Sequence, residues 1–256
     1  MDINCDLGES FGNWRMGDDA AMIPLITTAN VACGFHAGDP LTMSGTVELA
    51  RTHGVAIGAH PGLPDLLGFG RRRMEMTPEE IYAATLYQVG ALSAFLKVRG
   101  CELHHVKAHG ALYHLLREHE PLAEAVVRAL KDIMPTPVTY WPAPTGRSLF
   151  ARMARAAGIR VVGELYVDLD YDAEARLIIE RNKGRRDIGA VRARVAHYLA
   201  TGTILSITGE SLPADAESIC VHGDSPDAVG IVSAVREELV RNDIGIEPAS
   251  IRSDGA

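Results

Sequence analysis

The stretch VAIGAHPG (residues 55–62) is a short apolar run that ends on His60, directly before Pro and Gly. Three further runs carry His36, His109 and His222 at or just past their ends: IPLITTANVACGFHAGD (23–39), HHVKAHGALY (104–113) and SICVHGD (218–224). The run MDINCDLGES (1–10) offers Asp6 and Glu9 instead. Nearly continuous apolar runs are typical of parallel strands covered on both faces. Because parallel strands end at one rim, we expect these side chains to converge there, where imidazoles and carboxylates suit proton transfer or metal-assisted chemistry.

Helical patterns alternate with these runs, at residues 40–54, 77–100, 111–133, 148–158, 188–202 and 225–244. The segment 77–100 is the clearest, because Thr77 and Glu80 form a capping-box pattern and Gly100 follows as a stop. Residues 202–217 suggest an extra hairpin. The series amounts to seven β–α units, which right-handed crossovers would close into a barrel. We therefore predict an α/β fold, namely a seven-stranded, TIM-barrel-like (β/α) barrel with residues 1–256 as a single domain.

Composition narrows the classes of function. The chain has 256 residues, of which 47% are hydrophobic, so it can bury a large core. Its formal net charge of -8 argues against a nucleic-acid partner. None of the four cysteines forms a CxxC pair, which indicates free thiols in a reducing compartment. No uninterrupted apolar stretch reaches about 18 residues, so we expect no membrane span and a cytoplasmic protein.

The polar residues at the ends of the predicted strands are the candidates for a functional site. They are Asn4, Asp6, Glu9, Asn30, His36, Asp39, His60, Asp65, Lys107, His109, Tyr113, Glu164, Asp168, His222 and Asp224. Several have a structural alternative, because Asn30 and Asp39 could cap turns or helices, and Asp224 has the pattern of a helix N-cap. A single histidine at a strand end is usually structural, but four in the same position favour a shared site.

Lys107 and His109 are two residues apart, so on a strand they face the same side. A lysine that points into a barrel mouth is unfavourable unless a charge pairs with it. Asp6, Glu164 or a substrate carboxylate would provide that charge. The basic run Arg71–Arg73, by contrast, is interpreted as a solvated loop.

Metal binding is the rival use of these residues. The sequence has no HExxH motif and no CxxC motif. A site assembled from different strand ends, with Asp6, His60 and His109 as ligands, would suit Zn²⁺ or another divalent ion with an open coordination position. No GxSxG elbow and no GxxxxGK[ST] phosphate loop is present.

Five blocks resemble the LamB/YcsF family: INCDLGESFG, TTANVACGFHAGDP, GVAIGAHPGLPDLLGFGRR, VKAHGALY and SICVHGD. The resemblance implies a seven-stranded β/α barrel related to polysaccharide deacetylases and glycoside hydrolases. It also implies ATP-dependent cleavage of the lactam 5-oxoproline to L-glutamate, with ATP and Mg as cofactors and two further subunits as partners.

Roles can be assigned as expectations. The expected catalytic residues are Asp6, Glu9, His36, His60, Lys107 and His109, and the expected substrate-binding residues are Asn4, Asn30, Glu164, Asp168, His222 and Asp224. Asp6 or a histidine would deprotonate water, Lys107 would stabilise the oxygen charge or hold the substrate carboxylate, and His222 would protonate the departing nitrogen.

The chain departs from the family pattern near the rim. Ala108 and His114 stand in VKAHGALYH, where the family usually reads VKPHGALYN. Leu169 replaces a usual Arg and Ala175 a usual Gly. Loss of an arginine could remove a carboxylate or phosphate clamp, which leaves the identity of the lactam open.

Two alternatives remain open from the sequence. One is a metal-dependent deacetylase or amidohydrolase that acts alone on another cyclic amide, and the other is a non-catalytic subunit that binds the substrate for a partner. The sequence also leaves a homo-oligomer open.

Overall fold

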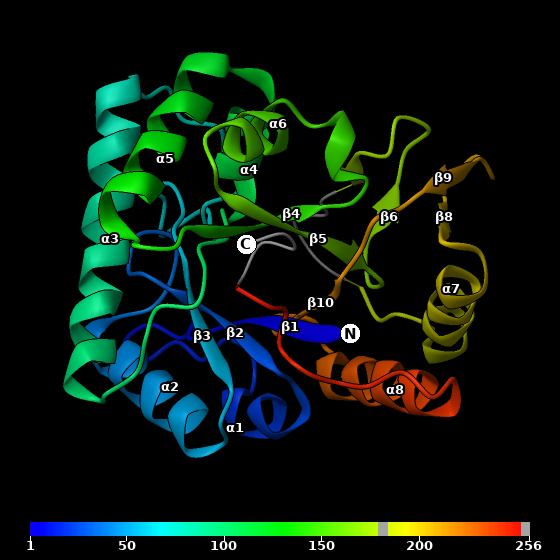
Figure 1. Ribbon diagram of the computed structural model, residues 1–256. Helices are drawn as coiled ribbons and strands as arrows, with labels where there is room; N and C mark the ends of the chain where they lie inside the picture. The colour runs from blue at the N-terminus through cyan, green and yellow to red at the C-terminus, as the bar shows by residue number, and fades with distance from the viewer. Residues whose placement is uncertain (179–183, 252–256) are drawn as a thin grey trace.

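A curled parallel β-sheet forms the centre of the protein, which is represented by a computed structural model that describes residues 1–178 and 184–251 (Figure 1). In these ranges the sheet has six strands in the order β3-β2-β1-β10-β5-β4, and every neighbouring pair is parallel. The strands are β1 (Asp2–Leu7), β2 (Thr28–Ala32), β3 (Ala56–His60), β4 (Val138–Pro142), β5 (Arg160–Tyr166) and β10 (Ser218–His222). The predicted α/β fold with a parallel sheet is confirmed.

The predicted strand around Lys107 is reduced to single bridges in the described structure. Val106 bridges in parallel to Ala59 of β3 and to Thr139 of β4, so this segment lies between the two edge strands of the sheet. Backbone bonds to the β3 side continue from Lys107 N–H to Ala59 and from His109 N–H to Pro61, but Pro61 has no N–H to donate to the Lys107 carbonyl. That carbonyl accepts a 2.7 Å hydrogen bond from His60 Nδ1 instead. A side chain of the site thus takes the place of one backbone hydrogen bond between two segments of the sheet.

Helices surround the strands on the outside (Figure 1). They are α1 (Asp19–Met22), α2 (Pro40–Thr52), α3 (Pro78–Val98), α4 (Gly110–Glu118), α5 (Glu120–Ile133), α6 (Leu149–Ala156), α7 (Ile188–Thr201) and α8 (Ala228–Arg241), with 3-10 turns η1 (Ile23–Leu25) and η2 (Thr145–Arg147). Helix α3 packs on α5, α5 on α6, and α7 on α8. Short antiparallel ribbons pair β6 (Asp170–Tyr171) with β7 (Leu177–Ile178), and β8 (Thr203–Leu205) with β9 (Ser211–Pro213). The β8–β9 ribbon confirms the predicted hairpin.

Helix ends follow the sequence signals at one position and depart from them at another. The predicted capping box of α3 is present, with the Glu80 carboxylate accepting from the Thr77 N–H at 2.7 Å. The segment predicted as one helix over 111–133 is instead α4 and α5, which meet at His119. Pro121 lies in the first turn of α5 and has no N–H to continue the hydrogen bonding of α4.

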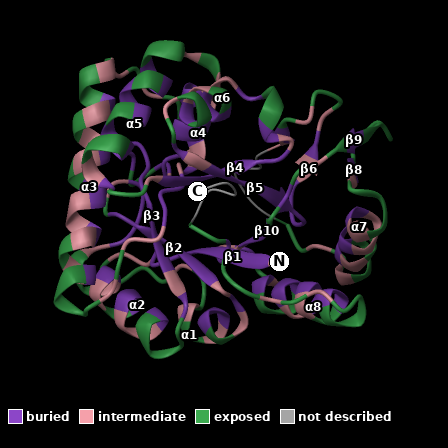
Figure 2. Ribbon diagram, in the orientation of Figure 1, coloured by how far each residue is buried: buried purple, intermediate pink, exposed green. Residues whose placement is uncertain are grey.

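Helix α3 is the described segment that bears on the expectation of no membrane span. It has 21 residues and a mean hydropathy of 1.2, so by length and composition it could cross a membrane. In this structure, however, it lies on the outside of the sheet, where it buries Ile81, Val89 and Leu92 and packs against α2, α5 and β3, while much of its length is half-buried or exposed (Figure 2). One such helix is weak evidence for a membrane.

The strands are buried on both faces, but the two faces differ in chemistry (Figure 2). On β1, Ile3, Cys5 and Leu7 pack in the hydrophobic core, whereas the alternating Asn4 and Asp6 bond to groups from the other strands. Successive strand residues point to opposite faces, so one face of β1 is apolar and the other is polar. The curled sheet therefore encloses a polar interior that leads to the ends of the strands.

Candidate functional site

A narrow pocket opens at the carboxyl ends of the strands, with a cavity of about 40 Å³. Strand β1 carries Asp6 there, beside His222 of β10 in register, and β3 carries His60 at its last position. The complete lining is Asp6, His60, Arg71, Lys107, Ala108, His109, Gly110, Tyr113, Tyr166, Leu169 and His222. The predicted convergence of strand-end side chains is therefore present in the structure.

Lys107 forms the charged floor of this pocket and is 2% exposed. Its Nζ lies 3.1 Å from Asp6 Oδ1 and 3.1 Å from Glu164 Oε2, and it also donates to Asn4 Oδ1 at 3.1 Å. Burial alone lowers the pKa of Lys107, but the carboxylates of Asp6 and Glu164 outweigh it and raise the pKa well above its ordinary value. The ammonium is thus permanently charged and its hydrogens are directed at protein acceptors.

Asn4 and Asn30 lie beneath this floor. Asn4 Nδ2 donates to Glu164 Oε2 at 3.1 Å, and Asn30 Nδ2 donates to Asp6 Oδ1 at 2.8 Å. Both are fully buried and the residues described as lining the pocket do not include them. These two predicted substrate-binding residues and Glu164 therefore lie under the pocket, where they orient the charged groups of Asp6 and Lys107.

Asp6 is the most heavily bonded carboxylate of the site. Its Oδ1 accepts from Asn30 and Lys107, and its Oδ2 lies 3.2 Å from His60 Nε2. Burial alone raises the pKa of Asp6, yet His60 and Lys107 lower it well below its ordinary value. A carboxylate with so low a pKa stays ionised at neutral pH and is a weak proton acceptor there.

His222 and Asp168 form a second pair at the mouth. His222 Nδ1 lies 2.8 Å from Asp168 Oδ2, and His222 Nε2 lies 3.8 Å from Asp6 Oδ2. The Asp168 carboxylate also accepts from the His222 backbone N–H at 3.1 Å. A carboxylate that holds one ring nitrogen fixes the tautomer and leaves the other nitrogen to act on a substrate.

Glu9 and His36 lie next to His60 and His109, on the side of the pocket formed by β1–β3. The ligand atoms of these four buried residues lie within 4.8 Å of one another. Burial lowers the pKa of His36 and of His109 well below the usual value, so both rings are neutral at pH 7. These four residues adjoin Asp6 and Lys107. All six predicted catalytic residues therefore form one continuous cluster.

Arg71 and Asp224 correct two expectations. The Arg71 guanidinium lines the pocket, with its side chain 11% exposed, and donates to Asp224 Oδ2 at 2.8 Å. It is therefore a site residue and not part of a solvated loop. Asp224 is held by this ion pair, and the N-cap of α8 is Asp227. The conformation of the loop from 61 to 77 brings Arg71 here, and no periodic pattern in the sequence predicts that path.

Tyr166 is a lining residue that the sequence alone did not single out as a site residue, and Leu169, which differs from the family pattern, lines the pocket as well. Tyr166 donates from its hydroxyl to Glu164 Oε1 at 2.5 Å and follows Glu164 by two residues on β5, so both face the interior. That spacing was the available signal. Leu169 presents an apolar side chain in the position where the family usually has Arg.

Asp39 and Asp65 are among the sequence candidates outside the pocket lining, and both have structural partners. Asp39 is the N-cap of α2 and accepts from the backbone N–H groups of Leu41 and Thr42. Asp65 is buried and bonds to Arg72. The helix-capping alternative is therefore confirmed for Asp39. Tyr113, the remaining candidate, does line the pocket.

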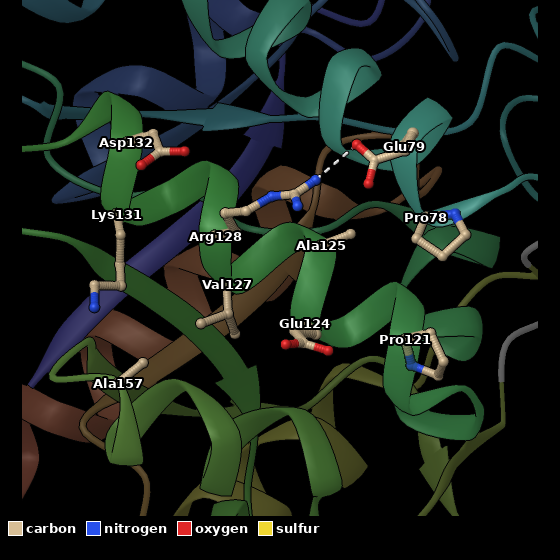
Figure 3. Close-up of a pocket in the computed structure, with 10 residues that line it drawn as sticks. All are labelled: Pro78, Glu79, Pro121, Glu124, Ala125, Val127, Arg128, Lys131, Asp132 and Ala157. Carbon is tan, nitrogen blue, oxygen red and sulfur yellow. Dashed lines mark hydrogen bonds and ion pairs between the residues drawn. The ribbon is translucent and has the colours of Figure 1, made fainter.

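A larger hollow lies elsewhere, between α3, α5 and the end of α6 (Figure 3). Its lining includes the Arg128–Glu79 ion pair at 2.8 Å, with Lys131 and Asp132 farther along α5. The described lining shares no residue with the pocket at the strand ends. Its charged side chains are exposed, so it has the character of a surface groove between helices.

The fold and the site together define a TIM-barrel-like α/β protein with a pocket of titratable groups at the carboxyl ends of its strands. The chain belongs to the LamB/YcsF family, whose sequence model matches residues 1–253.

Proteins named as subunits of 5-oxoprolinase are similar over nearly the whole length. That of Bordetella parapertussis is 43% identical over 97% of this chain and 98% of its own, and that of Deinococcus radiodurans is 46% identical over 95% of each. The crystal structure of a lactam utilization protein from Thermus thermophilus superimposes with a TM-score of 0.88 at 39% identity, over 96% of this chain and 98% of that one. A GH113 β-mannanase from Alicyclobacillus acidocaldarius shares only the fold, with a TM-score of 0.52 at 10% identity over 93% and 97% of the two chains.

Proposed function

We propose that this protein is the lactam-binding subunit of an ATP-dependent 5-oxoprolinase and that it opens the ring of 5-oxoproline to give L-glutamate. The observation that carries the proposal is the convergence of Asp6, Lys107 and His222 on one pocket. The near full-length similarity to proteins named as 5-oxoprolinase subunits supports the substrate class.

Substrate binding is assigned to the mouth of the pocket. Lys107 already directs its hydrogens at Asp6, Asn4 and Glu164, so it is poorly placed to hold a second carboxylate. Arg71 is better placed, because a guanidinium has five N–H donors and the ion pair with Asp224 uses one of its nitrogens. The N-terminus of α4 also opens on the pocket through Ala108 and Gly110, and its dipole favours an anion.

The ring opening must activate a lactam that water attacks slowly. In the proposed sequence, the γ-phosphoryl group of ATP is transferred to the lactam oxygen, the P–O bond to ADP breaks, and the ring carbon becomes electrophilic. Water then adds to that carbon, the C–N bond breaks, and the nitrogen takes up a proton, which leaves an acyl phosphate. A second water hydrolyses the acyl phosphate to glutamate and phosphate.

His222 is the best proton carrier for these steps. Its Nδ1 is held by Asp168, and its Nε2 is at the mouth beside Asp6. Asp6 is the weaker base because its pKa lies well below the usual range, so we assign it to orient the water and to stabilise a cationic partner. Lys107 acts as a positioning residue that keeps Asp6 ionised and holds the carboxylates of Asp6 and Glu164 in place.

Partners and cofactors are part of the proposal. Two further subunits would complete the enzyme, ATP with Mg would drive it, and the cytoplasm would be its location. The bridges from Val106 to β3 and β4 support a barrel closed by seven parallel segments. The alternative of a metal-dependent amidohydrolase that acts alone is favoured by one observation, the cluster of Glu9, His36, His60 and His109.

The test is a glutamate-release assay with 5-oxoproline and related lactams, with and without ATP and the two partner subunits. Turnover only with ATP and both partners supports the proposal. Turnover by the isolated chain without ATP would favour the independent amidohydrolase. Binding of 5-oxoproline without turnover in the complete system would favour a non-catalytic binding subunit.

A further inference from the structure

The hydrogen bonds of His60 and His109 fix which ring nitrogens carry protons. His60 Nδ1 lies 2.7 Å from the carbonyl oxygen of Lys107, and His109 Nε2 lies 2.8 Å from the carbonyl oxygen of Phe69. A carbonyl oxygen only accepts hydrogen bonds, so both of these nitrogens must be N–H donors. In the neutral rings, the other two nitrogens, His60 Nε2 and His109 Nδ1, then bear lone pairs.

These two lone-pair nitrogens face each other at 3.0 Å. Neither can donate to the other in the neutral state, so the contact is repulsive unless a positive centre lies beside it. Carboxylate oxygens close the same space, because Asp6 Oδ2 is 3.2 Å from His60 Nε2 and Glu9 Oε1 is 3.9 Å from His109 Nδ1. These acceptor atoms come from three segments of the chain: those of Glu9, His60 and His109 lie within 4.8 Å of one another, and Asp6 Oδ2 adjoins His60.

Buried carboxylates also surround this volume. Asp6, Glu9, Glu164 and Asp168 are each at most 5% exposed, whereas Lys107 is the one comparably buried ammonium or guanidinium among the described residues. The Arg71–Asp224 pair compensates itself. A proton on His60 would relieve one contact, but a divalent cation would satisfy both nitrogens and both carboxylates.

We propose that His60 Nε2, His109 Nδ1, Asp6 and Glu9 bind one divalent transition-metal ion. The backbone carbonyls on the outer ring nitrogens are the orienting contacts typical of metal-bound histidines. With metal–ligand bonds of about 2.1 Å, ligand atoms 3.0 Å apart subtend about 90° at the ion. That angle fits five- or six-coordination, and two imidazoles with two carboxylates suit Zn²⁺, Co²⁺ or Mn²⁺ better than Ca²⁺.

His36 is the neighbour that is not a ligand in this arrangement. Its ring stacks on that of His109 with centroids 3.7 Å apart and planes 4° apart, so the in-plane lone pairs of the two rings run parallel and do not meet at one ion. Both His36 nitrogens lack a hydrogen-bond partner among the described residues, although Nε2 is 3.5 Å from Glu9 Oε1. The role of His36 therefore distinguishes two arrangements: in this one only His60 and His109 bind the ion, and in the other all three clustered histidines bind it.

The metal site does not rest on the proposed lactam chemistry. It can be measured on the isolated full-length chain, without ATP, substrate or partner subunits. Failure of the 5-oxoproline assay would leave a metal-binding result intact, and absence of metal binding would leave the ATP-driven reaction intact. If both hold, the ion would supply a Lewis acid beside the pocket that Asp6 lines.

The test is a calorimetric titration of chelator-treated chain at pH 7.5 with Zn²⁺, Co²⁺ and Mn²⁺, each separately, with Co²⁺ absorption as a second readout. One equivalent with a Kd below about 1 µM is expected for Zn²⁺. His60→Gln and His109→Gln should each weaken binding at least about 100-fold. His36→Gln should weaken it less than about 10-fold, and the exposed His53→Gln should leave it unchanged.

If one of these variants does not fold, a measurement on the wild-type protein provides the test instead. Long-range ¹H–¹⁵N spectra of the metal-free chain should show a proton on Nδ1 of His60 and on Nε2 of His109, with the opposite nitrogens shifted when Zn²⁺ is added. The proposal is overturned if the folded wild-type chain binds none of the three ions at 100 µM, or if His60 carries protons on both nitrogens and its spectrum ignores Zn²⁺. Equal affinity in the His60, His109 and His53 variants would also overturn it.

Discussion

His222 donates through Nδ1 to Asp168 at 2.8 Å, and its Nε2 lies 3.8 Å from Asp6. The pair therefore joins the strand end of β10 to the loop after β5, and it points one free nitrogen at the pocket.

Asp168→Asn should lower the kcat of the reconstituted enzyme by about 10²- to 10⁴-fold, because the amide can hold the wrong tautomer of His222. Substrate KM should change much less, since the binding groups at the mouth are untouched. The measurement is the pH dependence of kcat in both proteins. An Asp168→Asn enzyme with wild-type kcat and an unshifted pH profile would exclude His222 as the proton carrier.

Lys107→Met should destabilise the protein by about 3–5 kcal/mol, because it leaves the buried carboxylates of Asp6 and Glu164 without their ammonium. Adding Glu164→Gln to this variant should recover part of the loss. The free energy of unfolding in urea decides the matter. Loss of less than about 1 kcal/mol, or no recovery in the double variant, would mean that this network contributes little.

Gly58→Ala should be strongly destabilising, because a Cβ at this position would lie 2.1 Å from the ring of His105. Gly45→Ala is the matched control, since it lies inside α2 and a Cβ there meets nothing within 4 Å. The control should stabilise by about 0.5–1 kcal/mol. Thermal unfolding of the two variants should therefore shift in opposite directions, and equal shifts would refute the close packing of His105 on β3.

Acid should destabilise the metal-free chain through its buried histidines. Burial lowers the pKa of His105 well below its ordinary value, so the unfolded chain binds the proton first. The stabilising contribution is complete above the unfolded-state pKa of about 6.5 and declines as the pH falls from there toward the folded-state pKa, by up to about 1.4 kcal/mol per pH unit.

The corresponding experiment is urea unfolding at pH 7.5 and 5.5 in buffer with a chelator. His105→Gln keeps a donor for Asn30 and removes the titration, so its loss of stability between the two pH values should be smaller than that of the wild type. Identical losses would show that His105 does not contribute to the acid sensitivity.

The sequence predicted which side chains meet, because parallel strands end at one rim whatever their order. It did not predict how deep each side chain lies: Asn4 and Glu164 share a face with Asp6 and Tyr166 but point into the interior below the pocket. Period-2 alternation assigns a face and leaves depth undetermined.

Two other features depended on information that periodicity does not carry. The position of Arg71 depends on the path of a long loop, and the pairing of the segment around Lys107 depends on Pro61, which cannot donate to the Lys107 carbonyl that His60 contacts instead. Both involve contacts between segments far apart in the sequence. Local patterns of residues therefore identified the rim and not its complete lining.

The most direct test of the proposed function is the rate of glutamate release from 5-oxoproline by the complete complex with Asp6→Asn in place of the wild-type chain. We expect at least about a 10³-fold lower rate with the complex still assembled, because the amide removes the charge on which Lys107 and His60 converge. A rate within a few-fold of wild type would show that the ring is opened elsewhere.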